Sequence, residues 1–247
     1  MIRNPQLFFE ELKQKRVGVA GLGVSHFELI RLMLRKGISV TVLDKREMAA
    51  LGEDGRILEK EGARFILGEG YLDALCSFDV LFRTPGMYFN HPRLRELMRA
   101  GCAITSELEL FMQCCPCPII GVTGSDGKTT TTSLIAEMLR QSGKTVHLGG
   151  NIGRALFPEL ETVKPDDTAV VELSSFQLLS MRQSPEIAVV TNVTPNHLDV
   201  HRDMAEYVAA KENIFTHQSR EDIAIFNADN AITAEQSTRA PGRARAG

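Results

Sequence analysis

The sequence of 247 residues has no apolar run that approaches the roughly 20 residues needed to span a bilayer. Its first residues, Met1 to Pro5, contain no apolar core of a secretory signal peptide. The formal net charge is -3, so no basic excess points to nucleic acid as the main partner. These absences argue against a membrane protein, a secreted protein and a nucleic-acid-binding protein. We therefore place the chain in the cytoplasm. We also expect it to be a monomer.

Cysteine is also scarce, with five residues in a chain too long to depend on disulfides. Cys114, Cys115 and Cys117 lie close together, but no second pair of Cys or His follows at the spacing of a zinc site. We interpret the cluster as small apolar residues that lead into the next strand. Neither an internal repeat nor a low-complexity linker is present. The length and a hydrophobic content of 43% indicate about one or two globular domains.

One glycine-rich stretch separates an apolar run from a helical pattern. The run from Pro118 to Val122 indicates a buried strand, and the pattern from Ser133 to Gln141 indicates a helix. Glycines in such a turn let backbone N–H groups surround an anion, and the helix N-terminus adds its partial positive charge. Lys128 can reach the β- and γ-phosphates of a nucleotide, and the Thr129 hydroxyl can bind Mg²⁺. The predicted ATP site comprises Gly124, Ser125, Asp126, Gly127, Lys128, Thr129 and Thr130.

This stretch departs from the strict P-loop pattern, because Val122 stands where the first glycine of that pattern falls. A glycine-rich turn before an ordinary helix is therefore the alternative. The succession of strand, Gly-Lys-Thr-Thr and helix favours the nucleotide site, since this is the structural context that the motif requires.

A second glycine turn lies near the start of the chain, in the order strand, turn, helix, strand. Val17–Ala20 is predicted as a buried strand and Gly21–Ser25 as the turn. Ile38–Leu43 is the next strand, and it ends in Asp44. An acidic residue about 20 positions after the glycines is typical of mononucleotide-binding halves. The dinucleotide fingerprint is only partial, because His26 stands at its third glycine, so an NAD-dependent oxidoreductase is an alternative.

The remaining strands and helices alternate along the chain, which predicts an α/β fold with mostly parallel sheets. The spacing of Ser25 and Glu28 predicts a capping box for the helix after the first glycine turn. Further strands are expected at 63–67, 80–82, 103–104, 145–148, 168–172, 187–193 and 223–226, and further helices at 5–13, 91–100, 107–112 and 204–215. Two domains are predicted, 1–115 and 116–247. Residues 237–247 show no periodicity, so we expect a tail without regular structure and a strand at 223–226 that lacks a neighbour.

Polar side chains follow several predicted strands in the second half of the chain. Glu172 ends a buried strand, where a carboxylate faces the crevice of a parallel sheet, and it is a candidate Mg²⁺ ligand. Local hydrogen bonds of that carboxylate are the alternative. Asn151 lies in the turn Gly149–Gly153 and is, by residue type alone, an ordinary turn residue. Lys211 lies on a predicted helix, where its spacing alone indicates a solvent-exposed lysine.

Three segments resemble sequence motifs of the Mur ligases, a family of ATP-dependent enzymes that form amide bonds. They are Thr123 to Thr130, Glu172 to Leu178 and Asn196 to Asp199. The first is shared with folylpolyglutamate synthetases, whereas the second and Gly149–Gly153 are most similar to the D-glutamate-adding branch of the family. The resemblance implies a Rossmann-like domain that binds the UDP part of a substrate, followed by a P-loop central domain with a mostly parallel sheet.

The resemblance also implies substrates, cofactors and residue roles. ATP and Mg²⁺ are expected, together with UDP-N-acetylmuramoyl-L-alanine and D-glutamate, in the synthesis of peptidoglycan precursors. Catalysis is expected from Lys128, His197 and Lys211. The metal ligands would be Thr129, Glu172, His197 and a carbamylated Lys211. The substrate would be bound by Gly23, Val24, Ser25, Asp44, Lys45, Arg46, Thr84, Pro85, Gly86 and Asn151.

Two alternatives stand beside the oxidoreductase: the L-alanine-adding ligase of the same family, and a nucleotide-binding module without catalysis. The family carries a third domain that supplies the amino-acid site, and the resemblance covers only the first two domains. We therefore expect that the 247-residue chain by itself is not a working ligase.

Overall fold

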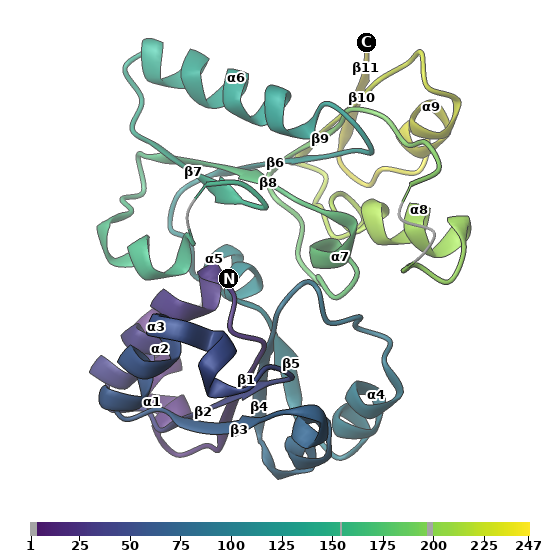
Figure 1. Cartoon of the computed structure of the whole chain (residues 1–247). Coiled ribbons are helices and arrows are strands. Elements are labelled where there is room, and N and C mark those ends of the chain that lie inside the picture. Colours follow the sequence, from purple (N-terminus) through teal and green to yellow (C-terminus); the bar gives the residue numbers. More distant parts are fainter. Residues whose placement is uncertain (1–3, 154, 197–199) are drawn as a thin grey trace. The chain divides into compact units, whose positions relative to one another are not determined.

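The computed structural model describes residues 4–153, 155–196 and 200–247. The chain divides into two compact units, Met1–Leu110 and Phe111–Gly247, each built around one parallel sheet (Figure 1). Helix α5 (Glu107–Cys114) crosses this division, and the boundary expected from the sequence follows its C-terminus. The predicted α/β class with parallel sheets is confirmed.

The first unit has a five-stranded sheet in the order β3-β2-β1-β4-β5, with parallel pairing throughout. Its strands are β1 (Val17–Ala20), β2 (Val40–Asp44), β3 (Arg64–Leu67), β4 (Val80–Arg83) and β5 (Ala103–Thr105). Its helices are α1 (Pro5–Lys13), α2 (Val24–Arg35), α3 (Met48–Lys60), the 3₁₀ helix η1 (Glu69–Ser77) and α4 (Pro92–Arg99). Because the strand order reverses at β1, the carboxyl ends of β1 and β4 form the kind of crevice that binds ligands in open α/β sheets.

Local sequence explains the start of two helices. Asn4 Oδ1 accepts the N–H of Gln6 at 2.9 Å, and Pro5 opens α1, as predicted. Ser106 and Glu109 form a capping box at the start of α5, with both hydrogen bonds at 3.2 Å. These caps satisfy N–H groups that a helix start would otherwise leave without partners.

The second unit has a six-stranded sheet in the order β11-β10-β9-β6-β8-β7, again with parallel pairing. Its strands are β6 (Ile119–Thr123), β7 (Val146–Gly150), β8 (Thr168–Glu172), β9 (Ile187–Val190), β10 (Ile223–Phe226) and β11 (Arg243–Ala246). Its helices are α6 (Lys128–Gln141), η2 (Phe157–Thr162), α7 (Ser175–Leu178), α8 (Met204–Glu212) and α9 (Ala231–Ser237). Helix α6 lies over one face of the sheet, and α7 and α8 lie together on the opposite side (Figure 1).

Two helices begin at positions other than those predicted. Helix α2 begins directly after Gly23, which is its N-cap, and no side chain caps it, so the capping box at Ser25 is absent. Helix α6 begins at Lys128 rather than at Ser133, because Gly127 adopts a left-handed conformation (φ 76°) and turns the chain straight into the helix. The helix therefore starts where the predicted phosphate-binding residues lie.

The C-terminal residues also differ from the prediction. Residues 243–246 form β11, which pairs in parallel with β10. Since β10 lies between β9 and β11, the expected strand without a neighbour is wrong. Arg243 and Arg245 are exposed on this edge strand, and charged side chains at a sheet edge disfavour pairing with another chain.

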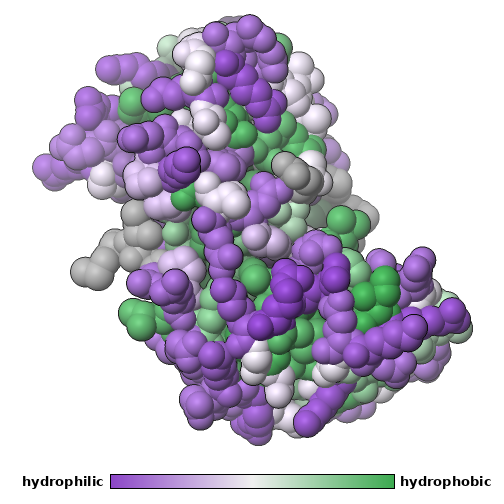
Figure 2. All heavy atoms as spheres, turned by 90° about the vertical axis from the view of Figure 1, so that its left-hand side faces the viewer, coloured by the Kyte–Doolittle hydropathy of each residue, from purple (hydrophilic) through white to green (hydrophobic). Residues whose placement is uncertain are grey.

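Exposed hydrophobic side chains are distributed over several elements of the chain. The large ones are Leu7, Val24, Leu134, Met138, Val200 and Ile225. The face drawn in Figure 2 is mostly hydrophilic, with hydrophobic atoms between the polar side chains. Within the described ranges, no helix has the length and apolar character needed to cross a membrane.

Candidate functional site

The segment from Gly124 to Thr130 joins β6 to the start of α6. At Gly124 a Cβ atom would collide with the Thr191 hydroxyl, and Gly127 has the left-handed conformation that favours glycine. Both glycines are therefore required by the path of the backbone. The N–H groups in the first turn of α6, beginning with Lys128, have no acceptor within the helix and are available to an anion.

Asn192 holds this turn from the segment that follows β9. Its Oδ1 accepts the N–H groups of Ser125 (3.1 Å) and Asp126 (2.9 Å). The neighbouring Thr191 hydroxyl donates to the Asp126 carbonyl at 2.6 Å. These bonds fix the conformation of the turn. No motif singles out Thr191 or Asn192, although a Thr-Asn pair directly after a buried strand is a signal that could have found them.

Three predicted site residues meet at the carboxyl end of β8. The Thr129 hydroxyl donates to Glu172 Oε2 at 2.7 Å, and the Asn151 side-chain amide donates to Glu172 Oε1 at 2.8 Å. Glu172 is only 1% exposed. Hydroxyl and carboxylate oxygens are ligands that Mg²⁺ prefers. Across the part of the chain that is described, no group of three His, Cys, Asp or Glu side chains is placed to hold a metal ion, so a cation here would rely on mixed oxygen donors.

Lys211, on α8, is buried against the glycine turn. Its Nζ donates to the Gly124 carbonyl at 2.7 Å and lies 4.7 Å from the centre of the Tyr207 ring. Burial lowers the pKa of Lys211 to about 7, with repulsion from Lys128 adding to this effect and Asp126 opposing it. The exposed lysine that spacing alone indicates is therefore wrong. The neutral form of this amine is therefore accessible near neutral pH.

A cavity of about 190 Å³ lies among these residues in the second unit. It is lined by Lys128, Asn151, Ser174, Ser175, Phe176, Tyr207 and Lys211. Lys128 Nζ donates to the Ser125 carbonyl at 2.9 Å, so its charge stays at the turn. The structure thus brings Lys128, Lys211 and Asn151 together, as the sequence analysis expects of site residues. His197, the remaining predicted catalytic residue, lies outside the described residues.

A larger pocket of about 560 Å³ opens in the first unit. It is lined by Gly21, Leu22, Gly23, Asp44, Lys45, Arg46, Tyr71, Leu72, Thr84, Gly86, Met87, Tyr88 and His91. Most of the substrate residues expected in this unit are among them. Val24, Ser25 and Pro85 are not, and Val24 is 86% exposed at the start of α2. The aromatic residues and His91 are additions that no motif indicates.

Asp44 organises this pocket through hydrogen bonds within the chain. Its Oδ2 accepts the N–H of Leu22 at 2.8 Å, and its Oδ1 accepts the backbone N–H of Arg46 at 2.9 Å. The Arg46 guanidinium donates to both carboxylate oxygens, at 2.9 and 2.7 Å. Burial favours the neutral acid, but the hydrogen bonds from Arg46 and Leu22 outweigh it and lower the pKa of Asp44. A charged Asp44 therefore connects the glycine turn to Arg46.

Two further buried residues shape the same pocket. His26 Nδ1 lies 2.6 Å from the Gly21 carbonyl oxygen, and burial lowers the pKa of His26, so the imidazole is neutral at pH 7. Arg83 donates to the Met87 carbonyl at 3.0 Å, and its guanidinium lies 5.2 Å from the centre of the Phe89 ring. His26 thus fixes the glycine turn, and Arg83 fixes the loop after β4. The sequence signal that could have found His26 is its position, because it stands where the dinucleotide fingerprint has its third glycine.

Comparisons with known proteins relate both units of the chain to one protein family. A family model described as the Mur ligase middle domain matches residues 122–244, and one described as the Mur ligase MurD-like, N-terminal domain matches residues 15–106. The chain belongs to the Mur ligase family. The MurD-like match falls on the unit with the larger pocket, and the middle-domain match falls on the unit with the glycine turn.

This Mur ligase chain has close relatives among curated proteins. It is 46% identical over 245 residues to a UDP-N-acetylmuramoylalanine–D-glutamate ligase of Clostridium kluyveri. It is 49% identical over 235 residues to the ligase of the same name of Acetivibrio thermocellus. The matches cover 99% and 95% of this chain, but 54% and 50% of those proteins. The chain therefore spans about half the length of the curated relatives it matches.

Solved structures of other Mur ligases share the fold at lower identity. The UDP-N-acetylmuramate:L-alanyl-gamma-D-glutamyl-meso-diaminopimelate ligase from Neisseria meningitides matches with a TM-score of 0.60 and 17% identity, over 94% of this chain and 77% of that chain. The UDP-N-acetylmuramate-alanine ligase from Thermotoga maritima matches with a TM-score of 0.51 and 21% identity, over 90% of this chain and 51% of that chain. At these identities the likeness establishes the fold of the Mur ligase chain alone.

Proposed function

We propose that the chain is the part of a D-glutamate-adding ligase that binds UDP-N-acetylmuramoyl-L-alanine and the phosphates of ATP. The observation that carries this proposal is the cavity of the second unit, where Lys128, Lys211 and Asn151 meet at the glycine turn. The family uses ATP, and the curated relatives are named for D-glutamate and UDP-N-acetylmuramoylalanine. We place the reaction in the cytoplasm, where ATP is supplied, and propose that the protein acts as a monomer.

Amide formation requires activation, because a carboxylate is a poor electrophile. Transfer of the γ-phosphoryl group of ATP to the substrate carboxylate gives an acyl phosphate, and the amine of D-glutamate then displaces phosphate. Phosphoryl transfer depends mainly on positioning and on neutralisation of charge. In this chain the Lys128 ammonium and the N–H groups at the start of α6 supply both, since they are fixed at the turn before a ligand arrives.

The residues at the carboxyl end of β8 fit a Mg²⁺ ion that accompanies the nucleotide. Thr129 and Glu172 offer a hydroxyl and a carboxylate oxygen within 2.7 Å of each other. When bound, the ion would supply positive charge to the transferred phosphoryl group.

Lys211 fits the proposed carbamate. Only a neutral amine adds to carbon dioxide, and a pKa lowered to about 7 makes the neutral form of this buried amine accessible near neutral pH. The carbamate oxygens and His197 would then be available as further metal ligands.

The pocket of the first unit suits the UDP part of the substrate. Its volume of about 560 Å³ lies in the range of small-molecule sites. Helix α2 has no side-chain cap, so its first N–H groups are available to the pyrophosphate. We assign Gly23, Val24 and Ser25 to the pyrophosphate, and Asp44, Lys45 and Arg46 to the neighbourhood of the uracil and ribose. Thr84, Pro85 and Gly86 would meet the sugar.

The alternatives have specific observations against them. The names of the relatives at 46% and 49% identity favour D-glutamate over L-alanine as the amino acid. An NAD-dependent oxidoreductase is disfavoured, because the buried His26 contacts the glycine turn where a third glycine would admit a dinucleotide. A buried lysine beside the glycine turn favours catalysis over a module that only binds nucleotides.

The test is phosphate release by the full-length protein with ATP and Mg²⁺. One reaction contains UDP-N-acetylmuramoyl-L-alanine and D-glutamate, and the other contains UDP-N-acetylmuramate and L-alanine. Release that depends on D-glutamate supports the proposal, and release that depends on L-alanine supports the related ligase. No release in either reaction supports the non-catalytic module. A calorimetric titration with NAD, beside one with UDP, tests the oxidoreductase.

A further inference from the structure

Three side chains form a row of contacts that begins at the lining of the second-unit cavity. Ser175 lines the cavity, and its Oγ lies 2.9 Å from Nε2 of His201. The other ring nitrogen of His201, Nδ1, lies 3.5 Å from Oε2 of Glu206. His201 is 2% exposed, and it is not among the residues that line the cavity. Ser175 therefore stands between the cavity and a histidine–carboxylate pair.

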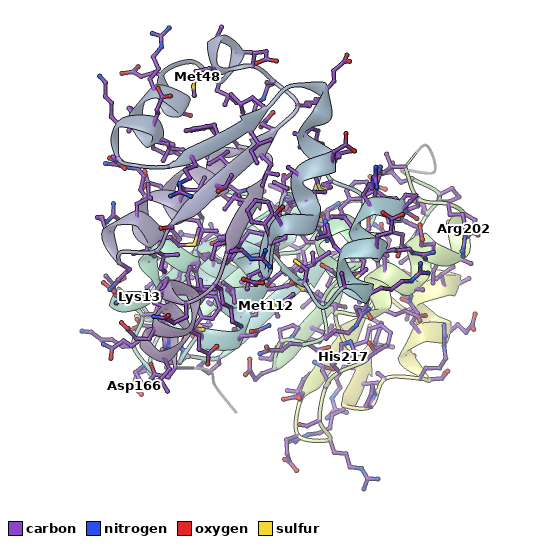
Figure 3. All side chains as sticks on the ribbon, turned by 90° about the horizontal axis from the view of Figure 1, so that it is seen from below. Lys13, Met48, Met112, Asp166, Arg202 and His217 are labelled. Atoms are coloured by element: carbon purple, nitrogen blue, oxygen red, sulfur yellow. The ribbon has the colours of Figure 1, made fainter. Side chains whose placement is uncertain are left out.

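The histidine is held in one orientation by its neighbours. Its ring stacks on Phe176 with the centroids 4.9 Å apart and the planes at 3°, and Tyr207 meets it edge-on at 5.3 Å. Glu206 accepts the backbone N–H of Arg202 at 2.9 Å, which fixes its carboxylate. Arg202, labelled in Figure 3, has an exposed side chain that bonds Asp203.

The start of α7 holds the serine in the same way. A capping box between Ser174 and Gln177 fixes the turn in which Ser175 lies. Ser175 itself is 2% exposed, so its hydroxyl has little solvent to bond. The three groups of the row are thus positioned by contacts that do not depend on a ligand.

The carboxylate of Glu206, 3.5 Å from Nδ1, influences through its charge which nitrogen of His201 carries the proton. A negative oxygen beside Nδ1 favours the tautomer that is protonated there, which leaves a lone pair on Nε2. Nε2 then accepts the Ser175 hydroxyl proton, and the Ser175 oxygen keeps its lone pairs for a donor in the cavity. Lys128, a cationic residue that lines the cavity, suits anionic groups. Ser175 is a lining residue whose hydroxyl is hydrogen-bonded to a histidine.

Resting on the proposed ligase function, we propose that Ser175 and His201 form a proton relay for attack by the amine. In this step a C–N bond forms at the acyl carbon, the C–O bond to phosphate breaks, and phosphate leaves with the electron pair. A proton of the attacking nitrogen passes to Ser175 Oγ while the hydroxyl proton of Ser175 passes to His201 Nε2. Glu206 stabilises the imidazolium, and the proton passes back from His201 Nε2 through Ser175 Oγ to solvent in the cavity when the products leave. Ser175 is the catalytic residue, and His201 and Glu206 are positioning residues.

The first experiment separates the two half-reactions in the full-length protein. With ATP and UDP-N-acetylmuramoyl-L-alanine, hydroxylamine traps the acyl phosphate as a hydroxamate, and this small amine is already neutral at pH 7. In Ser175→Ala and His201→Gln, hydroxamate formation should be nearly unchanged, whereas amide formation with D-glutamate should slow about 100-fold. The lost rate should recover as pH rises, because solvent then removes the proton. Among the described residues, Glu206 and Tyr207 are titratable groups that contact His201, and Glu206→Gln should slow amide formation by a smaller factor while hydroxamate formation stays nearly unchanged.

The outcomes distinguish the relay from the ligase function. If the unaltered protein forms no hydroxamate, the proposed function fails and the relay fails with it. If the protein forms hydroxamate but the variants slow both half-reactions equally, or neither, the relay alone is wrong. Ser175→Thr keeps the hydroxyl and should recover most of the amide rate. His147→Gln is the matched control, because His147 also pairs with a carboxylate (Asp167, 2.9 Å) but lies outside the cavity; it should change neither half-reaction.

The second experiment uses the 247-residue chain and needs no catalysis. Nitrogen-15 spectra of labelled histidine report the tautomer of His201. The His201 signal is assigned as the one that disappears in the spectrum of His201→Gln. We expect a protonated Nδ1 and an unprotonated Nε2, and an Nε2 shift in Ser175→Ala that His147→Gln does not cause. Protonation of Nε2 in the unaltered chain would remove the acceptor that the relay requires and would overturn the proposal, even if His201→Gln folded poorly.

Discussion

At the scale of single residues, Lys211 is deeply buried, and its burial in the folded chain disfavours the charged form of its amine. The side chain is 2% exposed, and burial lowers its pKa from 10.5 to about 7. Between these pH values the unfolded lysine holds more protons than the native one. The free energy of unfolding of the metal-free chain should therefore rise with pH across this window, and this group should contribute no slope below it.

Lys211→Met should remove that pH dependence and stabilise the metal-free chain at pH 7. The gain should be about 2 kcal/mol, because the substitution relieves the cost of burying an ammonium group. Urea unfolding near neutral pH and near the upper end of the window, with EDTA and without bicarbonate, measures both effects. Lys144→Met is the control, since Lys144 is exposed beyond the end of α6, and it should change neither quantity. A Lys211→Met chain less stable than the unaltered one at pH 7 would contradict this account.

We expect Asp44 to support UDP binding through the residues that it bonds. Asp44→Asn keeps the size of the side chain but weakens the charge-assisted bonds to Arg46, so the affinity for UDP should fall about tenfold. Calorimetric titration of the 247-residue chain with UDP measures the change. Asp79→Asn breaks a comparable ion pair with Arg16 outside the pocket and should leave UDP binding unaltered. Equal affinities in all three folded proteins would separate Asp44 from the site.

At the scale of elements, the sequence predicts best those segments whose own residues carry the signal. The apolar runs of β1 and β6 and the caps of α1 and α5 do so. The first turn of α6 does not, because its run of threonines has low helix propensity and is made helical by the turn before it. Strand β11 has only two alanines on its apolar face, and its extended form depends on pairing with β10.

The residues of the candidate site differ in the same way: some stand in sequence motifs, and others do not. Lys128, Thr129 and Glu172 stand in motifs, and the structure brings them together. Asn192 and His201 belong to the same region, but their partners, Ser125 and Ser175, lie far away in the sequence. Contacts of this kind arise from the parallel sheet, which brings the carboxyl ends of its strands to one edge, and no single segment encodes them.

The turn between β6 and α6 leads to a prediction about backbone space. Gly124→Ala places a Cβ atom against the Thr191 hydroxyl, so it should lower the free energy of unfolding by about 3 kcal/mol and abolish ATP binding. Gly143→Ala is the matched control: Gly143 also has a positive φ (85°), but its Cβ would meet nothing within 4 Å. It should cost about 1 kcal/mol and leave ATP binding intact. Nucleotide titration and urea unfolding give both numbers, and tight ATP binding by Gly124→Ala would show that the turn is not the nucleotide site.

At the scale of the whole molecule, two parallel-sheet units each contain a pocket, and the two pockets differ in size. The first unit offers about 560 Å³ beside an uncapped helix start, and the second offers about 190 Å³ beside the glycine turn. The curated relatives are about twice as long as this chain. The smaller cavity lies below the usual volume of ligand pockets, and in the proposed reaction it must already hold a phosphoryl group and an acyl carbon.

The 247-residue chain expressed by itself should therefore bind UDP and ATP separately, but should release no phosphate in response to D-glutamate. Acyl transfer needs the amine held in line with the acyl carbon, and such positioning lowers a barrier by about 7 kcal/mol or more. The acyl phosphate must also be shielded from water, which commonly requires a closing segment. Calorimetry with each nucleotide tests the expected binding. A phosphate-release assay with ATP, Mg²⁺, UDP-N-acetylmuramoyl-L-alanine and D-glutamate tests the expected lack of turnover, and Lys128→Ala gives the background rate. D-glutamate-dependent turnover at about 1 s⁻¹ or faster by this chain would show that its two units already contain the amino-acid site.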